Sequence, residues 1–374
     1  MMFEQARYLA SRGHEVTVFT SDALDSHRRI RERERVLDGV RVFAFPNLSN
    51  RLAWERKLFF PVGLVPHLRR TAGEFDVAHL SAVRSLLHVR VHRTLRSADL
   101  PYVVDAHGAL QRPQGWRRYP AALYDPLFLH PLLRHAGALI AQTVHESELY
   151  RTYVTDGPIE QLCLPISLAE FERATPPGFL RSRLGVGADT FVILFLGRIE
   201  RRKGVQFLVE AFAEFRQRAG VPSCLAIVGR DSGSLREVLR RIRELGLDGD
   251  AKFIGPVYGE DRVAAYRDAD VFALTPPYWE ETSLAALEAC ASGTPCVITR
   301  QAEIPGLDEA GAGVTVTYGD RSAVVDALIN IAANPGLRAE MGRRAAELVR
   351  RDFTIGRVGQ RLEEIYRTVL GRRT

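Results

Sequence analysis

The sequence predicts an α/β protein of two doubly wound domains, each with a parallel sheet covered by helices on both faces. Its 374 residues exceed the length of one ordinary domain. Short runs typical of strands alternate along the chain with helical patterns, and this alternation favours parallel strands joined by right-handed crossovers. An irregular stretch with Pro176, Pro177 and Gly178 interrupts the alternation. We therefore expect one domain in residues 1–168 and a second in residues 169–354.

The first half opens within a helical pattern, because apolar residues recur at helical spacing from Phe3 to Arg12 before Gly13. Helices are also expected around residues 84–97 and 145–152. Runs typical of strands lie at Val16–Thr20, Val40–Phe45, Val77–Leu80, Tyr102–Val104 and Leu139–Ala141.

The second half repeats the alternation, with helices beginning near residues 204, 233, 260, 283 and 321. Its runs typical of strands are Phe191–Leu196, Cys224–Val228, Lys252–Ile254, Val271–Leu274, Cys296–Thr299 and Val314–Val316. Two further helices, 336–351 and 355–371, complete the sequence. Open parallel sheets bind ligands at the carboxyl ends of their strands, so we expect the functional site in a cleft where these edges of the two domains face each other.

The composition indicates a soluble globular protein, with 46% hydrophobic and 26% charged residues, and excludes a disordered or fibrous chain. The longest apolar stretch, Leu58–Pro66, is about half as long as a membrane-spanning helix. The N-terminus lacks the basic, apolar and cleavage-site series of a signal peptide. A cytoplasmic location is therefore expected.

The net charge of +6 is concentrated in the first half of the chain. Residues 1–165 contain 22 basic and 17 acidic side chains, a balance of +5, whereas the remainder has 29 and 28, a balance of +1. This bias suits an anionic partner, either a phosphate-bearing substrate or an anionic membrane surface, although solvated helix faces also explain it. It is too small to indicate nucleic-acid binding.

A basic loop follows the strand expected at Phe191–Leu196. It contains Arg198 and Lys203 and ends at Gly204, where a helix begins. Cations beside a helix N-terminus favour an anion, and fixed cations can balance the charge of a departing diphosphate. Lysine is rare in this chain, at three of 51 basic residues, which sets Lys203 apart. The alternative is a solvated basic loop.

A pair of acids lies near the start of a later helix. Glu280 precedes this helix, and Glu288 lies two turns inside it. Carboxylates accept paired hydrogen bonds from vicinal hydroxyls, so a sugar and a ribose are natural ligands for such a pair. Thr282 and Ser283 would offer backbone amides to phosphate or sugar oxygens. Alternatively, Glu280 is a helix-dipole partner, and Glu288 lies on a polar helix face.

These two segments together resemble the retaining glycosyltransferase family 4, whose members have the two-domain GT-B fold. The series from Gly197 to Gly204 looks like that family's diphosphate-binding segment. Glu280 and Glu288, with seven residues between them, look like its signature acid pair. Both segments occur in order within the second domain.

The resemblance implies a role for each matching position. Residues 101–108 resemble the family's strand and His-Gly loop, which places His107 beside the transferring sugar as a catalytic residue together with Glu280. The last helix, within residues 355–374, resembles one that crosses back to the first domain. The implied donor contacts are Arg198 and Lys203 on the diphosphate, Thr282, Ser283 and Leu284 near phosphate or sugar, Glu288 on ribose hydroxyls, and Val257 against the nucleobase.

One departure from the family concerns the start of the chain. The family begins with a strand and a glycine-rich turn before its first helix, whereas this sequence begins inside that helix. The absent strand would be a central one, so the first sheet is expected to contain a gap. Either the start is truncated or misassigned, or part of the site has been lost.

The expected function is that of a hexosyltransferase-type glycosyltransferase (EC 2.4), which moves a sugar from a nucleoside-diphosphate donor to a hydroxyl acceptor with retention. No metal or other cofactor is expected. Asp268 and Asp270 match a metal-binding pattern, but they directly precede a strand, where Asp268 is expected to end a helix. The alternatives are a non-catalytic GT-B binding or scaffold protein and a nucleotide-sugar epimerase.

The acceptor is expected to be a saccharide or a lipid-linked saccharide, as in the assembly of polysaccharides. Residues 56–70 place apolar side chains between basic ends, as an interfacial membrane segment would. Pro61 and Pro66 break a long helix there, so a lip packed on the first domain is the alternative. Peripheral contact with the inner face of the membrane is thus one expectation.

Overall fold

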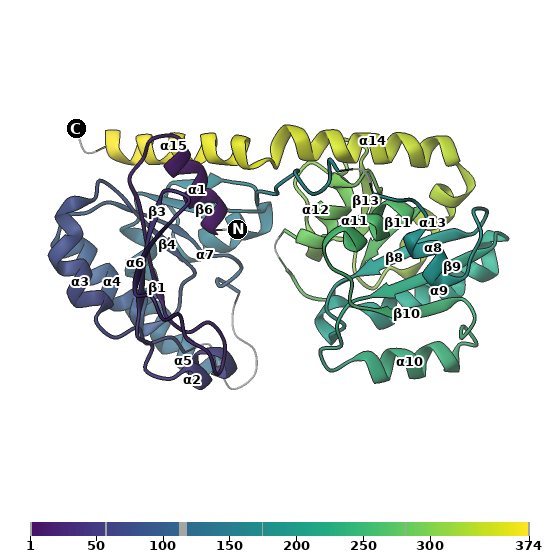
Figure 1. The fold of residues 1–374 in the computed structure, drawn as a ribbon, viewed down its shortest axis with the longest axis horizontal. Coiled ribbons are helices and arrows are strands. Elements are labelled where there is room, and N and C mark those ends of the chain that lie inside the picture. The colour runs from purple at the N-terminus through teal and green to yellow at the C-terminus, as the bar shows by residue number, and fades with distance from the viewer. Residues whose placement is uncertain (1, 57, 112–117, 174, 281, 373–374) are drawn as a thin grey trace. The chain divides into compact units, whose positions relative to one another are not determined.

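The computed structural model describes residues 2–56, 58–111, 118–173, 175–280 and 282–372. The chain divides into two compact units (Figure 1). Unit 1 comprises Met1–Cys163 and Ile355–Thr374, and unit 2 comprises Leu164–Thr354. The sequence analysis placed this boundary after residue 168.

Unit 1 contains two sheets. In the first, β1 (Val16–Ser21) pairs parallel with β3 (Val40–Phe45), and β2 (Glu34–Leu37) pairs antiparallel with β3. The second is parallel and has the order β4 (Ala78–Ser81), β5 (Tyr102–Asp105), β6 (Ala138–Ala141) and β7 (Ile159–Gln161). The sequence analysis missed β2 and β7. Both are short, and β2 is largely exposed, so neither shows the apolar pattern of a buried strand.

No hydrogen-bonded ladder joins β1 to β4 within the described residues, which agrees with the expected gap in the first sheet. The two sheets nevertheless share apolar cores. Val16 of β1 packs against the cluster that contains Val103 and Ile140 of the second sheet. Phe19, three residues further along β1, packs against a different cluster that contains Val104.

Helices surround the sheets of unit 1. The final helix, α15, supplies Leu362 and Ile365 to the cluster around Val103. Its buried Glu363 lies 3.3 Å from His14 and 3.0 Å from Arg367, which ties the helix to the turn before β1. The helices are α1 (Met2–Ser11), α2 (Asn50–Arg56), α3 (Leu64–Thr71), α4 (Leu86–Ser97), α5 (Arg118–Tyr124), α6 (His130–Arg134), α7 (Val144–Tyr153) and α15 (Ile355–Gly371).

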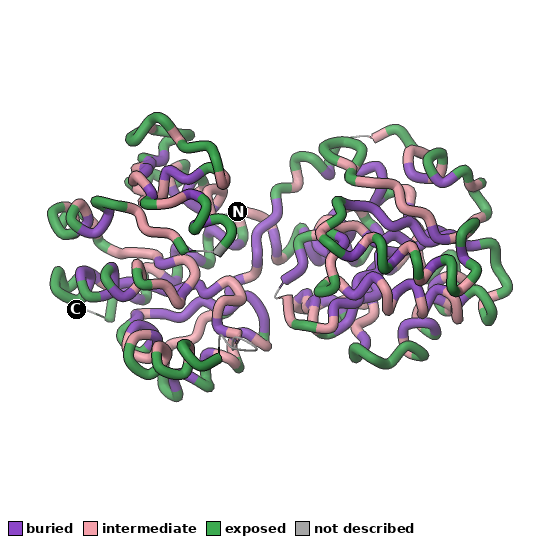
Figure 2. Tube along the Cα trace, turned by 90° about the horizontal axis from the view of Figure 1, so that it is seen from below, coloured by how far each residue is buried: buried purple, intermediate pink, exposed green. Residues whose placement is uncertain are grey.

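Unit 2 contains one parallel sheet of six strands in the order β10-β9-β8-β11-β12-β13. Three strands have the predicted bounds. The strand residues of unit 2 are mostly buried (Figure 2), as expected for a parallel sheet covered on both faces. The strands are β8 (Phe191–Leu196), β9 (Ser223–Val228), β10 (Ala251–Gly255), β11 (Val271–Leu274), β12 (Cys296–Thr299) and β13 (Gly313–Val316). The helices are α8 (Phe179–Leu184), α9 (Val205–Ala219), α10 (Leu235–Glu244), α11 (Gly259–Asp268), α12 (Leu284–Ala291), α13 (Arg321–Ala333) and α14 (Pro335–Asp352).

None of the helices in the described ranges is both long and apolar enough to cross a membrane.

Two histidines of unit 1, the partly buried His79 and the buried His92, have strongly lowered pKa values. His79 Nδ1 lies 2.7 Å from the Tyr366 hydroxyl, and burial lowers the pKa of His79 to about 3. Burial, with further repulsion from His135, lowers the pKa of His92 to about 4. Both side chains are therefore neutral at pH 7 in the folded protein.

These two histidines predict that the folded protein loses stability in mild acid. The unfolded chain takes up protons at these residues below about pH 6.5, whereas the folded chain does so only near pH 3 to 4. The free energy of unfolding should thus fall with decreasing pH, by at most about 1.4 kcal/mol per pH unit for each histidine. Urea denaturation between pH 7.5 and 5 measures this slope.

The variant His92→Phe should have a shallower slope than the wild type, and the exposed His27→Phe should keep the wild-type slope. Equal slopes in all three proteins would contradict the burial of an uncharged His92.

Candidate functional site

The predicted binding residues of unit 2 lie where the strand order of its sheet reverses. From β8 the chain moves to β9 and β10 on one side, and then crosses to β11 on the other side of β8. The loops that follow the neighbouring strands β8 and β11 therefore lie at the carboxyl edge of the sheet, at the switch in strand order where open α/β sheets bind ligands. The first loop carries Arg198 and Lys203, and the second carries Glu280 and Thr282.

An ion pair connects these two loops. Lys203 Nζ lies 2.7 Å from Glu280 Oε2, and the two side chains are only 19% and 10% exposed. Burial raises the pKa of Glu280, and the Lys203 ammonium opposes this shift. The backbone N–H of Glu280 donates to the carbonyl of Gln301 at 2.8 Å, which holds the main chain at Glu280 in place. An ammonium has three donors, so Lys203 retains N–H groups for an anionic ligand.

The backbones of the two loops touch at Gly204. This residue has φ of 69°, and a Cβ there would lie 1.7 Å from the carbonyl oxygen of Thr275. The Thr275 hydroxyl donates to the Gly204 carbonyl at 3.0 Å. Only glycine permits this approach. It also brings the N-terminus of α9, with its free amides, to the loop that carries Glu280.

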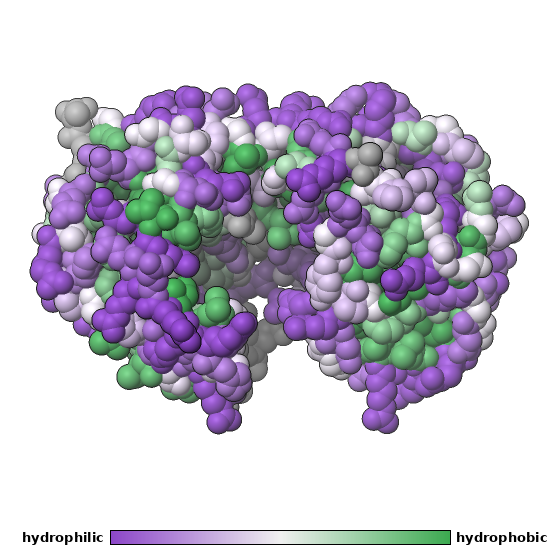
Figure 3. Space-filling view, viewed as in Figure 1, coloured by the Kyte–Doolittle hydropathy of each residue, from purple (hydrophilic) through white to green (hydrophobic). Residues whose placement is uncertain are grey.

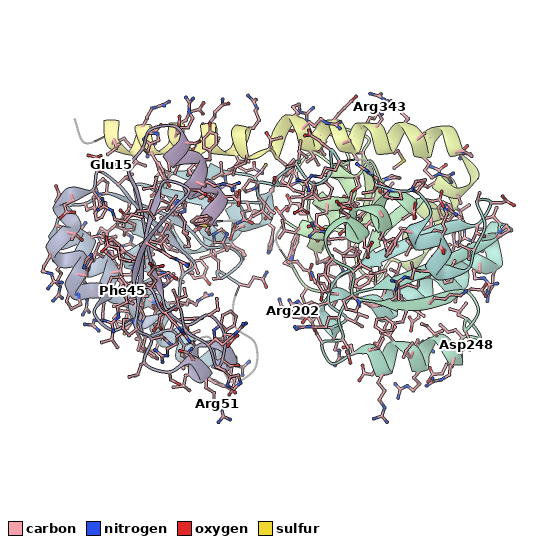
Figure 4. All side chains as sticks on the ribbon, viewed as in Figure 1. Glu15, Phe45, Arg51, Arg202, Asp248 and Arg343 are labelled. Atoms are coloured by element: carbon pink, nitrogen blue, oxygen red, sulfur yellow. The ribbon has the colours of Figure 1, made fainter. Side chains whose placement is uncertain are left out.

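Arg198 lies at the surface of the same loop. Its guanidinium is 61% exposed and lies 2.9 Å from Glu200. Arg202 is also exposed and extends from this loop (Figure 4). The Arg198 guanidinium is thus open to solvent, so an anionic ligand can reach it beside Glu200.

The N-terminus of α12 contains a buried hydroxyl that lacks a partner. Thr282 Oγ1 makes no hydrogen bond within the described part of the chain. Ser283 precedes the helix, and its side chain makes no capping bond. Leu284 is half-exposed beside them. Buried hydroxyls normally have a partner, so this helix start is suited to a polar ligand.

Glu288 is held by two side chains of α11. Its Oε2 accepts from the Tyr266 hydroxyl at 3.0 Å, and its Oε1 lies 3.0 Å from Arg262. Burial raises the pKa of Glu288, whereas Arg262 and Tyr266 lower it. Of the two alternatives for Glu288, the structure therefore shows a largely buried acid. Tyr266 and Arg262 were missed by the sequence analysis, since nothing in the spacing along the chain marks this contact between helices.

The remaining predicted positions of unit 2 have separate surroundings. Val257 is half-buried on the loop after β10, at the same carboxyl edge.

Asp268 and Asp270, which match a metal-binding pattern in the sequence, instead stabilise the fold. Asp268 accepts from the backbone N–H groups of Gly178 and Leu180, and Asp270 pairs with Arg181 at 2.7 Å.

His107 lies in unit 1 on the loop after β5. Its Nδ1 lies 2.5 Å from Nε2 of Gln142 and 3.3 Å from Oδ1 of Asp105. The backbone of His107 has φ of 48°, an uncommon value for a non-glycine residue. Burial lowers the pKa of His107 to about 4, so the imidazole is neutral at pH 7.

The buried carboxylate of Glu146 holds this loop in place. Glu146 Oε1 accepts from the backbone N–H of Gly108 at 2.9 Å, and its Oε2 accepts from the backbone N–H of Gln142 at 2.9 Å. Glu146 thereby connects the loop that carries His107 to Gln142, whose side chain contacts the His107 ring. The sequence analysis missed both Glu146 and Gln142. In the sequence, Glu146 is recognisable only as an acid in the first turn of a helix, and most such acids interact only with the N-terminus of their own helix.

The sequence is similar to known families over most of its length. Residues 190–334 match the family described as Glycosyl transferases group 1, and residues 2–164 match the Glycosyl transferase 4-like domain. The chain belongs to the group 1 glycosyl transferases. The proposed resemblance to glycosyltransferase family 4 is thereby confirmed.

Two relatives of this glycosyl transferase are named D-inositol 3-phosphate glycosyltransferase. The one from Saccharomonospora viridis is 37% identical over 198 residues, which cover 51% of this chain and 46% of that protein. The match therefore spans about half of that relative's length. The one from Corynebacterium diphtheriae is 29% identical over an alignment of 384 positions that covers 96% of this chain and 87% of that protein.

Solved structures with the same fold include a sucrose-phosphate synthase from Thermosynechococcus elongatus, at 19% identity and a TM-score of 0.74 over 99% of this chain and 93% of that one. HepE from Anabaena, in complex with UDP-glucose, has 20% identity and a TM-score of 0.64 over 86% and 85%. These similarities confirm the GT-B fold with two Rossmann-like domains.

The contacts of Glu146 predict the effect of the variant Glu146→Gln. The amide replaces one acceptor oxygen by a donor, so the N–H of either Gly108 or Gln142 loses its partner. Leaving a buried donor unsatisfied costs about 1–3 kcal/mol of folding free energy. We expect this loss in urea denaturation, together with faster hydrogen exchange at the affected amide. The exposed Glu148→Gln on the same helix is the control, and equal behaviour of the two variants would refute the role of Glu146.

Proposed function

We propose that this protein transfers a hexose from a nucleoside-diphosphate donor to a hydroxyl acceptor, with retention of configuration and without an essential metal. The observation that carries the proposal is the ion pair of Lys203 and Glu280 at the carboxyl edge of the unit 2 sheet. It places a cation for phosphate and a carboxylate for hydroxyl groups next to each other. A sugar linked to a diphosphate has both kinds of group.

The donor diphosphate would contact Arg198, Lys203 and the free amides at the start of α9 and α12. When the bond between the anomeric carbon and the phosphate oxygen breaks, the diphosphate leaves with the electron pair. The negative charge that develops is balanced by the two cations and the helix N-termini, which is the role that a metal has in other transferases. This supports metal independence.

Glu280 would accept hydrogen bonds from hydroxyls of the transferred sugar, and Glu288 would accept them from the ribose. An ionised carboxylate has about four lone-pair positions. Glu288 can therefore bind ribose while it keeps its bonds to Tyr266 and Arg262. Val257 would pack against the nucleobase.

His107 would donate a hydrogen bond to the transferring sugar as a neutral imidazole. Its depressed pKa supports the uncharged form at pH 7. The acceptor hydroxyl would attack the anomeric carbon from the face that the diphosphate leaves, and its proton would pass to the departing phosphate oxygen. Attack from that face retains the configuration of the donor.

The acceptor would be a hydroxyl of a saccharide or of a lipid-linked saccharide. The charge balance of +5 in residues 1–165 supports an acceptor that carries phosphate. The relatives named for D-inositol 3-phosphate agree with that chemistry.

Calorimetric titration with UDP, GDP and ADP, in buffer that contains a metal chelator, tests the donor site. We expect one of the three nucleotides to bind preferentially. Lys203→Ala removes the buried cation and Glu288→Ala the ribose acceptor, so each should weaken binding about tenfold or more, equivalent to about 1.4 kcal/mol. The control variants are Arg240→Ala and Glu244→Ala, an exposed ion pair on α10. A folded wild type that binds none of the nucleotides, or variants with unchanged affinity, would refute the proposed site.

A further inference from the structure

An apolar groove opens in unit 1 at the N-terminal ends of α3 and α4. Its volume is roughly 380 Å³, and it is lined by residues 59–63, Val65, Pro66, Leu86, Leu87 and Arg90. Arg90 is the one charged residue among these. The two helices lie side by side (Figure 1).

Exposed apolar side chains surround the groove. Val62 and Leu86 are each 58% exposed at its edge, and Leu58 is also exposed. Leu48, which is 70% exposed, joins this rim because its backbone N–H donates to the carbonyl of Phe60 at 3.0 Å. Figure 3 shows apolar patches of this kind on a mainly hydrophilic surface. Clustered exposed apolar side chains beside a groove mark a binding surface.

The surface of α3 and α4 beyond the groove is basic. The two helices contain no Asp or Glu. Their five arginines, all exposed, are Arg69, Arg70, Arg90, Arg93 and Arg96. On α4, Leu86, Arg90 and Arg93 recur at helical spacing and therefore share one face. Since Arg90 also lines the groove, the apolar rim continues into Arg90 and Arg93. We name this surface, together with the other exposed arginines of the two helices, the α3–α4 face.

We propose that the α3–α4 face docks the protein on a membrane that contains anionic lipids. The exposed leucines and Val62 would enter the interface between headgroups and acyl chains, while the arginines contact anionic headgroups. The positive charge of the arginines favours an anionic membrane over the other partners considered below. A second copy of the chain would bring Arg90 and Arg93 close to the same two arginines of its partner in a two-fold dimer. A nucleic acid would leave the apolar rim without a complementary surface.

This inference rests on unit 1 alone and is independent of the proposed transfer reaction. It includes the exposed face of α4 in addition to residues 56–70, for which membrane contact is expected from the sequence. It also defines how a lipid-linked acceptor would meet the protein, since such an acceptor remains in the membrane surface.

Cosedimentation of the full chain with vesicles tests the proposal. Vesicles of phosphatidylcholine alone are compared with vesicles of phosphatidylcholine and phosphatidylglycerol in equal parts. We expect binding to the mixed vesicles, weakened by salt, and much weaker binding to the neutral ones. The charge variant Arg90→Glu/Arg93→Glu and the apolar variant Val62→Ser/Leu86→Ser should each lower the partition coefficient at least about tenfold, because each removes one of the two interactions.

The control is Arg240→Glu/Arg343→Glu, which alters two exposed arginines of unit 2 and should bind as the wild type does. All substituted side chains are exposed, so the variants should fold, and their nucleotide affinity should be unchanged. Equal binding to neutral and anionic vesicles would overturn the proposal, as would wild-type binding by both variants. A chain that binds a soluble polyanion but does not bind anionic vesicles would favour an acidic macromolecule as the partner. This result would also overturn the proposal.

Discussion

The site in unit 2 depends on the close approach of the loops after β8 and β11. Gly204 and Thr275 are in backbone contact, and a side chain at residue 204 would clash with the Thr275 carbonyl. This contact holds Lys203 against Glu280, although 76 residues separate them in the chain. The start of α12, which follows the second loop, positions Thr282, Ser283, Leu284 and Glu288, whereas Val257 lies on the loop after β10.

Buried carboxylates fix the proposed functional loops in both units. Glu280 pairs with Lys203 in unit 2, and Glu146 receives two backbone N–H groups in unit 1. A buried carboxylate is costly unless it is paired or hydrogen-bonded, so each one requires its partners to stay in place. Rigid loops of this kind reduce the reorganisation that binding would otherwise require.

The sequence predicted the buried strands of unit 2 well, because parallel strands covered on both faces are continuous apolar runs. It also predicted that Lys203 and Glu280 belong to one site, through a family resemblance. It missed β2, whose side chains are largely exposed, and the partners of Glu288. Tyr266 and Arg262 lie on a neighbouring helix, and their contact depends on packing that no local pattern encodes. The same reason explains why Glu146 was missed, since its partners are backbone groups.

The central claim is that fixed cations, in place of a metal, balance the charge of a departing diphosphate during transfer with retention. Proton NMR of the purified chain with the nucleotide sugar that it binds tests this claim most directly. A chelator is present, and D-inositol 3-phosphate and a lipid-linked saccharide are offered as acceptors. The account predicts consumption of the donor without added metal and a glycoside with the anomeric configuration of the donor. An inverted product, or turnover that requires a divalent metal, would contradict it.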